Sequence, residues 1–244
     1  LLLEAAAQFH AARTSFPSLA DEAQAAWRRA QARKAAVVER LRQEKYLDVL
    51  AGYENVTLLR GQAELLGAGR VRVGEAVVGA RRVVIATGAA PAQPPVPGMT
   101  EAGALTSTSA MELAALPASL IVLGAGAVGL ELGQAFARFG VKVTVIEAEA
   151  RILPAEDPEL SNALANALAA EGLELRTGAR VTRVERDTTG YRLDVAQGGT
   201  EETLRAEQLL VATGRRPATA GLGLEAAGVE VDARGFVRVD GFMR

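Results

Sequence analysis

The chain has 244 residues, of which 49% are hydrophobic and 23% charged, so it can bury a core in one large domain or in two ordinary ones. A net charge of -2 leaves no basic surplus for binding nucleic acid or an anionic membrane surface. The chain contains no cysteine, which excludes disulfides, thiolate metal sites and cysteine nucleophiles among these residues.

No segment of the sequence predicts export or membrane insertion. The N-terminus lacks the basic segment, apolar run and cleavage site of a signal peptide. Residues 120–130 are among the most apolar, but they are too few to span a bilayer and include three glycines. We therefore expect a cytoplasmic protein.

The first fifty residues predict two antiparallel helices. Residues 1–12 are rich in Ala and Leu, and Pro17 breaks this helix-favouring run. From there to about Leu50 the sequence is helical in character, with an apolar stripe that includes Trp27. His10, the single histidine, has no partner at metal-ligand spacing, so we favour a surface or packing role for it over catalysis.

After Gly52 the pattern changes to short β-type runs. Residues 56–59, 70–73 and 82–86 are separated by glycines, which predicts a meander rather than a βαβ unit. Four prolines within residues 91–97 then predict a stiff linker and a domain boundary.

A βαβ unit follows this linker. Its predicted elements are a strand at 120–123, a glycine-rich turn at 124–129, a helix at 130–139, a strand at 141–147, a helix at 158–171 and a strand from 173. A second meander is predicted from the runs 181–185, 191–195 and 207–212.

The two meanders end in the same motif, A-T-G-x-x-P, at residues 86–91 and 212–217. This repetition predicts a duplicated architecture of two α/β parts. In the second copy the glycine-rich turn begins 89 residues before Thr213, and the same step back from Thr87 falls before residue 1. We therefore expect a first nucleotide-binding turn upstream of Leu1.

The turn at 124–129 reads G-x-G-x-x-G, a pattern typical of dinucleotide-binding sites when it follows a strand and opens a helix. Gly124 would allow the tight turn, Gly126 the close approach of a pyrophosphate and Gly129 the packing of helix on strand. The free N–H groups at the start of the helix would face the pyrophosphate. The alternative is a glycine turn without a ligand.

Three charged residues near this turn have distinct interpretations. Glu147 ends the second strand, 18 residues after Gly129, where a carboxylate can bind both adenine-ribose hydroxyls and repel a 2′-phosphate. Glu131 either faces the nicotinamide or is a solvated acid in the first turn of the helix. Arg151 either contacts a 2′-phosphate or caps a surface loop, and we favour the loop.

Three segments together resemble the pyridine nucleotide–disulfide oxidoreductases: residues 82–88 with their Pro tail, residues 124–129 with Glu131, and residues 209–217. The resemblance implies an α/β fold of tandem FAD- and NAD(P)-binding Rossmann-like (ββα) domains, with the FAD domain truncated. The expected boundaries are a partial FAD-binding domain at 1–103, an NAD(P)-binding domain at 104–220 and a return segment to the FAD domain at 221–244.

Shorter strings resemble the mercuric reductase branch of this family. They are Glu44–Tyr46, Arg60–Ala63, Leu105–Thr108, Ala206–Gly214 and Leu224–Val229. That branch implies transfer of a hydride from NAD(P)H through FAD to a cysteine pair, absent from these residues, which reduces Hg(II) to Hg(0) between soft thiolate ligands. The alternatives are a dihydrolipoamide dehydrogenase and a redox-inactive nucleotide-binding protein.

The resemblance assigns cofactor-binding roles residue by residue. Gly61 would meet the adenine end of the flavin, and Thr87 and Gly88 would line the flavin. The residues implied for the nicotinamide dinucleotide are Gly124, Gly126, Ala127, Val128, Gly129, Glu131, Glu147, Val181 and Gly214. Ala127 stands where some relatives place an aromatic over the nicotinamide pocket, which predicts an ungated pocket.

The cofactors implied are FAD and NAD, with NADP as an alternative, and the partner is a small-molecule or metal-ion substrate. The family forms homodimers through a C-terminal domain that these residues do not include. The Cys-x4-Cys segment and the Gly-Asp flavin motif are also absent, so we expect this chain to bind flavin poorly and to turn over no substrate. The acid at position 147 predicts a preference for NADH over NADPH.

Overall fold

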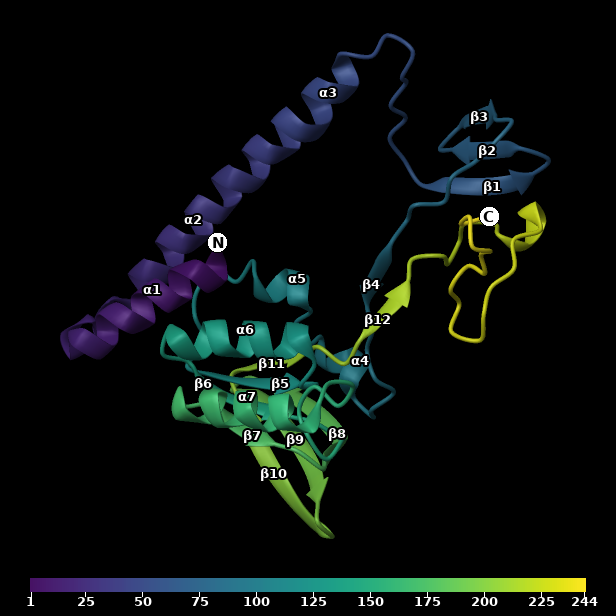
Figure 1. Ribbon diagram of the computed structural model, residues 1–244. Coiled ribbons are helices and arrows are strands. Elements are labelled where there is room, and N and C mark those ends of the chain that lie inside the picture. The colour runs from purple at the N-terminus through teal and green to yellow at the C-terminus, as the bar shows by residue number, and fades with distance from the viewer. The chain divides into compact units, whose positions relative to one another are not determined.

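The computed structural model describes residues 1–244, Ala20 by its backbone alone (Figure 1). The chain forms two compact units, each with more residue contacts within itself than with the other. Unit 1 comprises Leu1–Glu39 and Pro91–Gly214, and unit 2 comprises Arg40–Ala90 and Arg215–Arg244. This division differs from the boundaries expected from the sequence, because residues 1–39 and 91–103 group with the βαβ unit and residues 215–220 group with unit 2.

Unit 1 is built on a four-stranded parallel sheet in the order β11-β5-β6-β7. The strands are β5 (Ser119–Leu123), β6 (Lys142–Ile146), β7 (Glu174–Arg176) and β11 (Gln208–Val211). The central strands are almost entirely apolar and buried, as expected for a parallel sheet that is covered on both faces.

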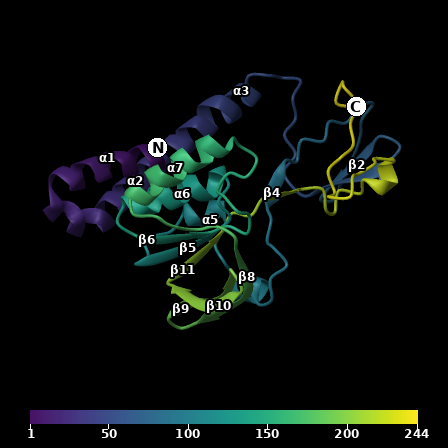
Figure 2. The same ribbon diagram turned by 60° about the horizontal axis from the view of Figure 1, so that its bottom comes forward.

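Helices cover one face of this sheet and an antiparallel meander covers the other (Figure 2). The covering helices are α6 (Ala127–Arg138) and α7 (Pro158–Ala170). Side chains alternate along β6, so Val143 and Val145 pack with the helices whereas Ile146 packs with the meander. The predicted βαβ unit is thus confirmed, with boundaries shifted by a few residues.

The N-terminal helices form an antiparallel pair against α6, which confirms the two helices predicted from the sequence (Figure 1). They are α1 (Leu2–Ser15) and α2 (Ala23–Arg42), joined by a 3₁₀ turn, η1 (Pro17–Glu22), and α2 continues into η2 (Gln43–Leu47) and α3 (Asp48–Ala51). Trp27 is 2% exposed and its ring lies 5.4 Å from those of both Phe136 and Phe139. Burial of this side chain explains why residues 1–39 group with unit 1.

The meander of unit 1 consists of β8 (Ala179–Asp187), β9 (Gly190–Gln197) and β10 (Thr200–Ala206). The sequence-based prediction of residues 207–212 as its third strand was wrong, since Thr200–Ala206 takes that place and Gln208–Val211 joins the parallel sheet. The reason is that Leu209, Leu210 and Val211 are fully apolar and fit only a strand buried on both faces.

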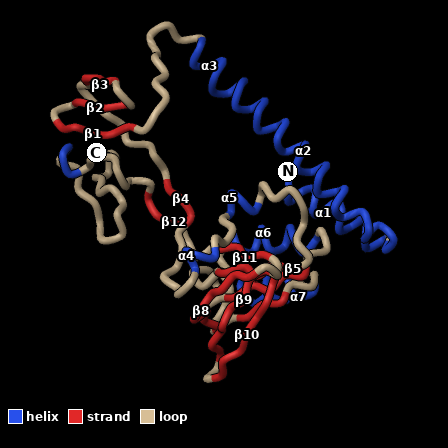
Figure 3. The backbone as a smooth tube through the Cα atoms, turned by 180° about the vertical axis from the view of Figure 1, so that it is seen from behind, coloured by secondary structure: helices blue, strands red, loops and turns tan.

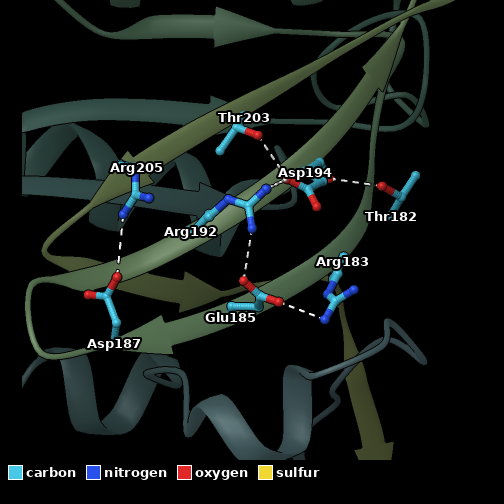
Figure 4. A network of polar contacts seen from close by, with 8 residues as sticks. All are labelled: Thr182, Arg183, Glu185, Asp187, Arg192, Asp194, Thr203 and Arg205. Atoms are coloured by element: carbon cyan, nitrogen blue, oxygen red, sulfur yellow. Dashed lines mark hydrogen bonds and ion pairs between the residues drawn. The ribbon is translucent and has the colours of Figure 1, made fainter.

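The meander carries a network of charged and hydroxyl side chains that pair both within and across strands (Figure 4). Arg192 of β9 donates to Glu185 and Asp194, and Thr203 donates to Asp194. The network also includes Arg183, which pairs with Glu185, Arg205, which pairs with Asp187, and Thr182. The pairs that link two strands, such as Arg192 with Glu185, stabilise an antiparallel sheet without burying charge.

The Pro-rich segment leads into two short helices, α4 (Met99–Ala102) and α5 (Ser107–Ala110). The predicted boundary is found at its start, between Ala90 and Pro91. The segment itself packs on unit 1, because the carbonyl of Pro97 accepts a hydrogen bond of 2.9 Å from the N–H of Val184. Met99 is buried in the core between the sheet and the meander. In the described part of the chain, no helix is both long and apolar enough to cross a membrane.

Unit 2 contains an antiparallel sheet of β1 (Ala63–Gly67), β2 (Arg70–Val73) and β3 (Ala76–Gly79), and a 3₁₀ turn, η3 (Glu225–Ala227). The prediction of a strand at 70–73 is confirmed, whereas those at 56–59 and 82–86 were wrong, and both runs are loops (Figure 3). A strand requires a hydrogen-bonded neighbour, which neither run has among the described residues. Val84 is accordingly 87% exposed.

The two A-T-G-x-x-P motifs end in strands that pair with each other, β4 (Ala89–Pro91) and β12 (Arg215–Pro217). Equivalent residues of the two repeats make equivalent bonds. The N–H of Ala92 donates to the carbonyl of Gly214, and the N–H of Ala218 donates to the carbonyl of Gly88, each at 3.0 Å. The repetition seen in the sequence thus has a matching repetition in backbone hydrogen bonding.

Candidate nucleotide-binding site

The glycine-rich turn joins β5 to α6 and is tightly packed at two of its three glycines. Gly124 has a φ of +98°, and a Cβ there would lie 2.7 Å from the carbonyl oxygen of Ala212. A Cβ on Gly129 would lie 2.0 Å from the carbonyl oxygen of Gly124, so only glycine lets α6 pack this closely on the turn. Around Gly126, by contrast, a Cβ would meet nothing within 4 Å.

The open space around Gly126 makes that side of the turn accessible to a ligand. Gly126 is the N-cap of α6, and among the described side chains none caps the first N–H groups of the helix. Those groups carry the positive end of the helix dipole and are typical ligands of phosphate. The open side of the turn at Gly126 therefore lies at the same place as the N–H groups that can bind a phosphate.

Glu147 follows β6 at the carboxyl edge of the sheet, and both of its carboxylate oxygens are fixed by backbone N–H groups. One oxygen accepts from Ala125 at 2.8 Å and the other from Glu149 at 3.0 Å. Because Ala125 belongs to the glycine-rich turn, the carboxylate is held directly beside that turn. Each oxygen retains a lone pair for a further donor.

A pocket of about 460 Å³ connects the turn with this carboxylate, and unit 1 alone lines it. Of the sequence-predicted residues, it brings together Gly124, Gly126, Glu147, Val181 and Gly214. The remaining lining residues are Pro94, Val96, Leu123, Ile146, Ala148, Pro154, Ala179, Arg180, Ala212 and Thr213. The pocket is mostly apolar, with a few convergent polar groups, as small-molecule sites usually are.

Four sequence-predicted residues lie on α6 outside this lining: Ala127, Val128, Gly129 and Glu131. Gly129 is buried against the turn, whereas Val128 and Glu131 are exposed. Arg151 does not enter the pocket lining either. Its guanidinium donates to the carbonyls of Pro154, at 2.7 Å, and Glu156, at 3.2 Å, and so ties its own loop together.

Most of the residues that sequence analysis missed come from segments far from the motif. Pro94 and Val96 reach the pocket from the Pro-rich segment, and Arg180 from the start of β8. Thr213 could have been found, because it stands in the repeated A-T-G motif next to Gly214. Nothing in the sequence distinguishes Arg180 from the other arginines of the chain.

The far end of α6 is anchored by an ion pair. Arg138 donates to both carboxylate oxygens of Glu171, at 2.8 and 2.7 Å, and Gln134 donates to the same carboxylate. The hydrogen bonds from Arg138 lower the pKa of Glu171 below its ordinary value. The ion pair therefore fixes the C-terminal end of α6, the helix that begins at the glycine-rich turn.

Unit 2 has a separate pocket of about 1110 Å³. Gly61 and Thr87 line it, together with residues 216–225 and parts of the C-terminal segment. Gly88 follows Thr87 but is not part of the lining. Of the three residues assigned to the flavin by resemblance, two therefore share one cavity.

Comparison with known proteins agrees on the family of this chain. A family model described as "Pyridine nucleotide-disulphide oxidoreductase" matches residues 1–244. The chain is 40% identical to mercuric reductase from Bacillus cereus over 208 residues, which are 85% of this chain and 33% of that protein. It is 44% identical to dihydrolipoyl dehydrogenase 3 from Pseudomonas aeruginosa over 195 residues, which are 76% of this chain and 41% of that protein.

Among solved structures, the chain resembles the HOCl-induced flavoprotein disulfide reductase RclA from Escherichia coli. The TM-score is 0.80 at 36% sequence identity, and the match covers 87% of this chain and 48% of that one. The chain thus spans less than half the length of each of these proteins.

Proposed function

Because the chain belongs to the pyridine nucleotide-disulphide oxidoreductase family, we propose that unit 1 binds NADH as part of a flavoprotein oxidoreductase. The observation that carries this proposal is the shared pocket of Gly126 and Glu147. Gly126 leaves space for a pyrophosphate, and Glu147 offers two fixed oxygens to the ribose hydroxyls.

Each part of a dinucleotide has a proposed partner in this pocket. The N–H groups at the start of α6 would bind the pyrophosphate, and Glu147 would bind the adenine ribose. The backbone at Val181 and Gly214 would contact the remainder of the molecule. The apolar lining would exclude water from the bound coenzyme.

For the flavin, Gly61 and Thr87 are the residues of unit 2 that fit, since both line its large pocket. Gly61 has a φ of +152°, a conformation that favours glycine. Because glycine has no side chain, a flavin can approach its backbone closely. A bound flavin supplies a two-electron relay between the nicotinamide and the final acceptor.

For the final acceptor we propose Hg(II), which the two electrons of one hydride reduce to Hg(0). The similarity to mercuric reductases over 85% of the chain supports this choice. The thiolates that would hold the metal are not among these 244 residues, which contain no cysteine. The second candidate is dihydrolipoyl oxidation, supported by 44% identity to a dihydrolipoyl dehydrogenase.

Coenzyme binding is tested by titrating the 244-residue chain with NADH and following nicotinamide fluorescence. We expect saturable binding that Gly126→Val abolishes, because its side chain would occupy the space left for the pyrophosphate. Gly79→Val is the matched control, since Gly79 also has open space around it but lies in unit 2. Equal binding by both variants would contradict the proposal.

The acceptor is tested in the full-length protein that carries this chain. We expect NADH oxidation that depends on Hg(II) and releases elemental mercury. Activity with dihydrolipoamide and NAD, without mercury-dependent turnover, would favour the second candidate.

A further inference from the structure

Arg180 is an unpaired cation in the wall of the unit 1 pocket. It is exposed, and no hydrogen bond or ion pair ties its guanidinium to another described residue. Neighbouring arginines differ in this respect. Arg151 is bound by loop carbonyls, Arg176 pairs with Glu174 and Glu202, and Arg183 pairs with Glu185.

The backbone places Arg180 next to Glu147. The N–H of Ala179 donates to the carbonyl of Glu147 at 2.9 Å, so Arg180 is one residue beyond this contact. Although the two residues have opposite charges and line the same pocket, they do not pair. The carboxylate of Glu147 is instead held by the N–H groups of Ala125 and Glu149.

This arrangement leaves the guanidinium free for an anion at the ribose. We propose that Arg180 is a specificity-determining residue that binds a 2′-phosphate, so that the pocket accepts NADPH as well as NADH. The proposal rests on the proposed binding of a nicotinamide dinucleotide. A guanidinium matches the geometry of phosphate oxygens and offsets the repulsion between Glu147 and the phosphate.

The decisive comparison uses two adenosine nucleotides that differ only in the 2′-phosphate: 5′-AMP and adenosine 2′,5′-bisphosphate. Their affinities for the 244-residue chain are measured by calorimetry at low salt, with wild type, Arg180→Gln and Arg183→Gln. Arg183 is the matched control, because it lies on the same strand but outside the pocket lining. Arg183→Gln changes the net charge by the same amount as Arg180→Gln.

We expect Arg180→Gln to weaken binding of the bisphosphate about tenfold, with the affinity for 5′-AMP changed less than about twofold. Arg183→Gln should leave both affinities near those of wild type. An equal loss for both nucleotides in Arg180→Gln would place Arg180 on their common part and overturn the inference.

Two further outcomes separate this inference from the proposed function. If wild type binds neither nucleotide and no NADH, the proposed function itself fails. If wild type binds 5′-AMP and NADH, and Arg180→Gln binds the bisphosphate as wild type does, only the role of Arg180 is overturned.

Discussion

The carboxylate of Glu147 accepts a hydrogen bond of 2.8 Å from the backbone N–H of Ala125, a residue of the glycine-rich turn. The turn that would bind the pyrophosphate therefore also orients the acid that would bind the ribose. A carboxylate fixed in this way cannot swing aside to admit a 2′-phosphate without losing that bond.

We therefore expect wild type to prefer NADH, and Glu147→Gln to shift the ratio of NADH to NADPH affinity toward NADPH. Loss of a hydrogen bond to a charged group costs on the order of 1.5–3 kcal/mol. At about 1.4 kcal/mol per tenfold, the ratio should change roughly tenfold or more. Glu149→Gln is the control, because it keeps the N–H that bonds Glu147. An unchanged ratio in Glu147→Gln would exclude a selective role for this residue.

Two alanine substitutions in the turn should separate folding from binding. Gly129→Ala places a Cβ 2.0 Å from a backbone oxygen, so we expect a loss of about 1–3 kcal/mol in the free energy of unfolding. Gly126→Ala meets no atom within 4 Å and should cost less than about 1 kcal/mol, yet weaken NADH binding. Urea unfolding and NADH titration measure both effects. Equal stability of the two variants would show that α6 does not depend on the close approach at Gly129.

Trp27→Ala should loosen the N-terminal helices from the rest of unit 1. The indole is 2% exposed, packs on two phenylalanine rings and donates to the carbonyl of Leu113 at 2.8 Å. Truncation of a buried tryptophan typically costs about 3–5 kcal/mol. Urea unfolding followed by circular dichroism measures the change, with Trp27→Phe expected to lose less. The exposed Arg33→Ala serves as a control on α2. Wild-type stability in Trp27→Ala would disprove the importance of this contact.

The pair of Arg138 and Glu171 predicts a pH-dependent contribution to stability. Since the pKa of Glu171 is lowered on folding, its contribution is present above the ordinary pKa of 4.5 and is lost as the pH falls through the folded value. Glu171→Gln should therefore destabilise the protein at pH 7 by on the order of 1 kcal/mol, because the pair is partly solvated. The difference from wild type should shrink below about pH 4.5.

Denaturant unfolding at several pH values between 3 and 7 measures this difference. Glu159→Gln, in the first turn of the same helix α7, is the control for loss of a carboxylate without an arginine partner. A gap between wild type and Glu171→Gln that does not vary with pH would contradict the assigned cause.

The βαβ unit could be predicted because its signals are local. The apolar run before Gly124, the three glycines and the apolar run that ends at Glu147 each act within a few residues. The structure moves the predicted helix start only from Leu130 to Ala127. The grouping of Gly124, Gly126 and Glu147 in one pocket follows from the parallel pairing of β5 and β6.

Features that depend on distant partners could not be predicted. The run 82–86 has the composition of a strand but no neighbour to pair with, whereas the charged run 200–206 is a strand because β9 lies beside it. The position of Arg180 likewise depends on the contact between Ala179 and Glu147, which no local pattern encodes.

The placement of β11 beside β5 has a consequence for the order of events during protein synthesis. The N–H of Glu207 donates to the hydroxyl of Ser119 across 88 residues, and Ala212, Thr213 and Gly214 of the pocket follow immediately after β11. Closure of so long a loop is entropically costly and slow. A nascent chain released from the ribosome only as far as the meander would have the glycine-rich turn and Glu147 but an unfinished pocket. If unit 1 binds the coenzyme as proposed, the coenzyme would stabilise the domain only after residue 214 has emerged and the pocket lining is complete.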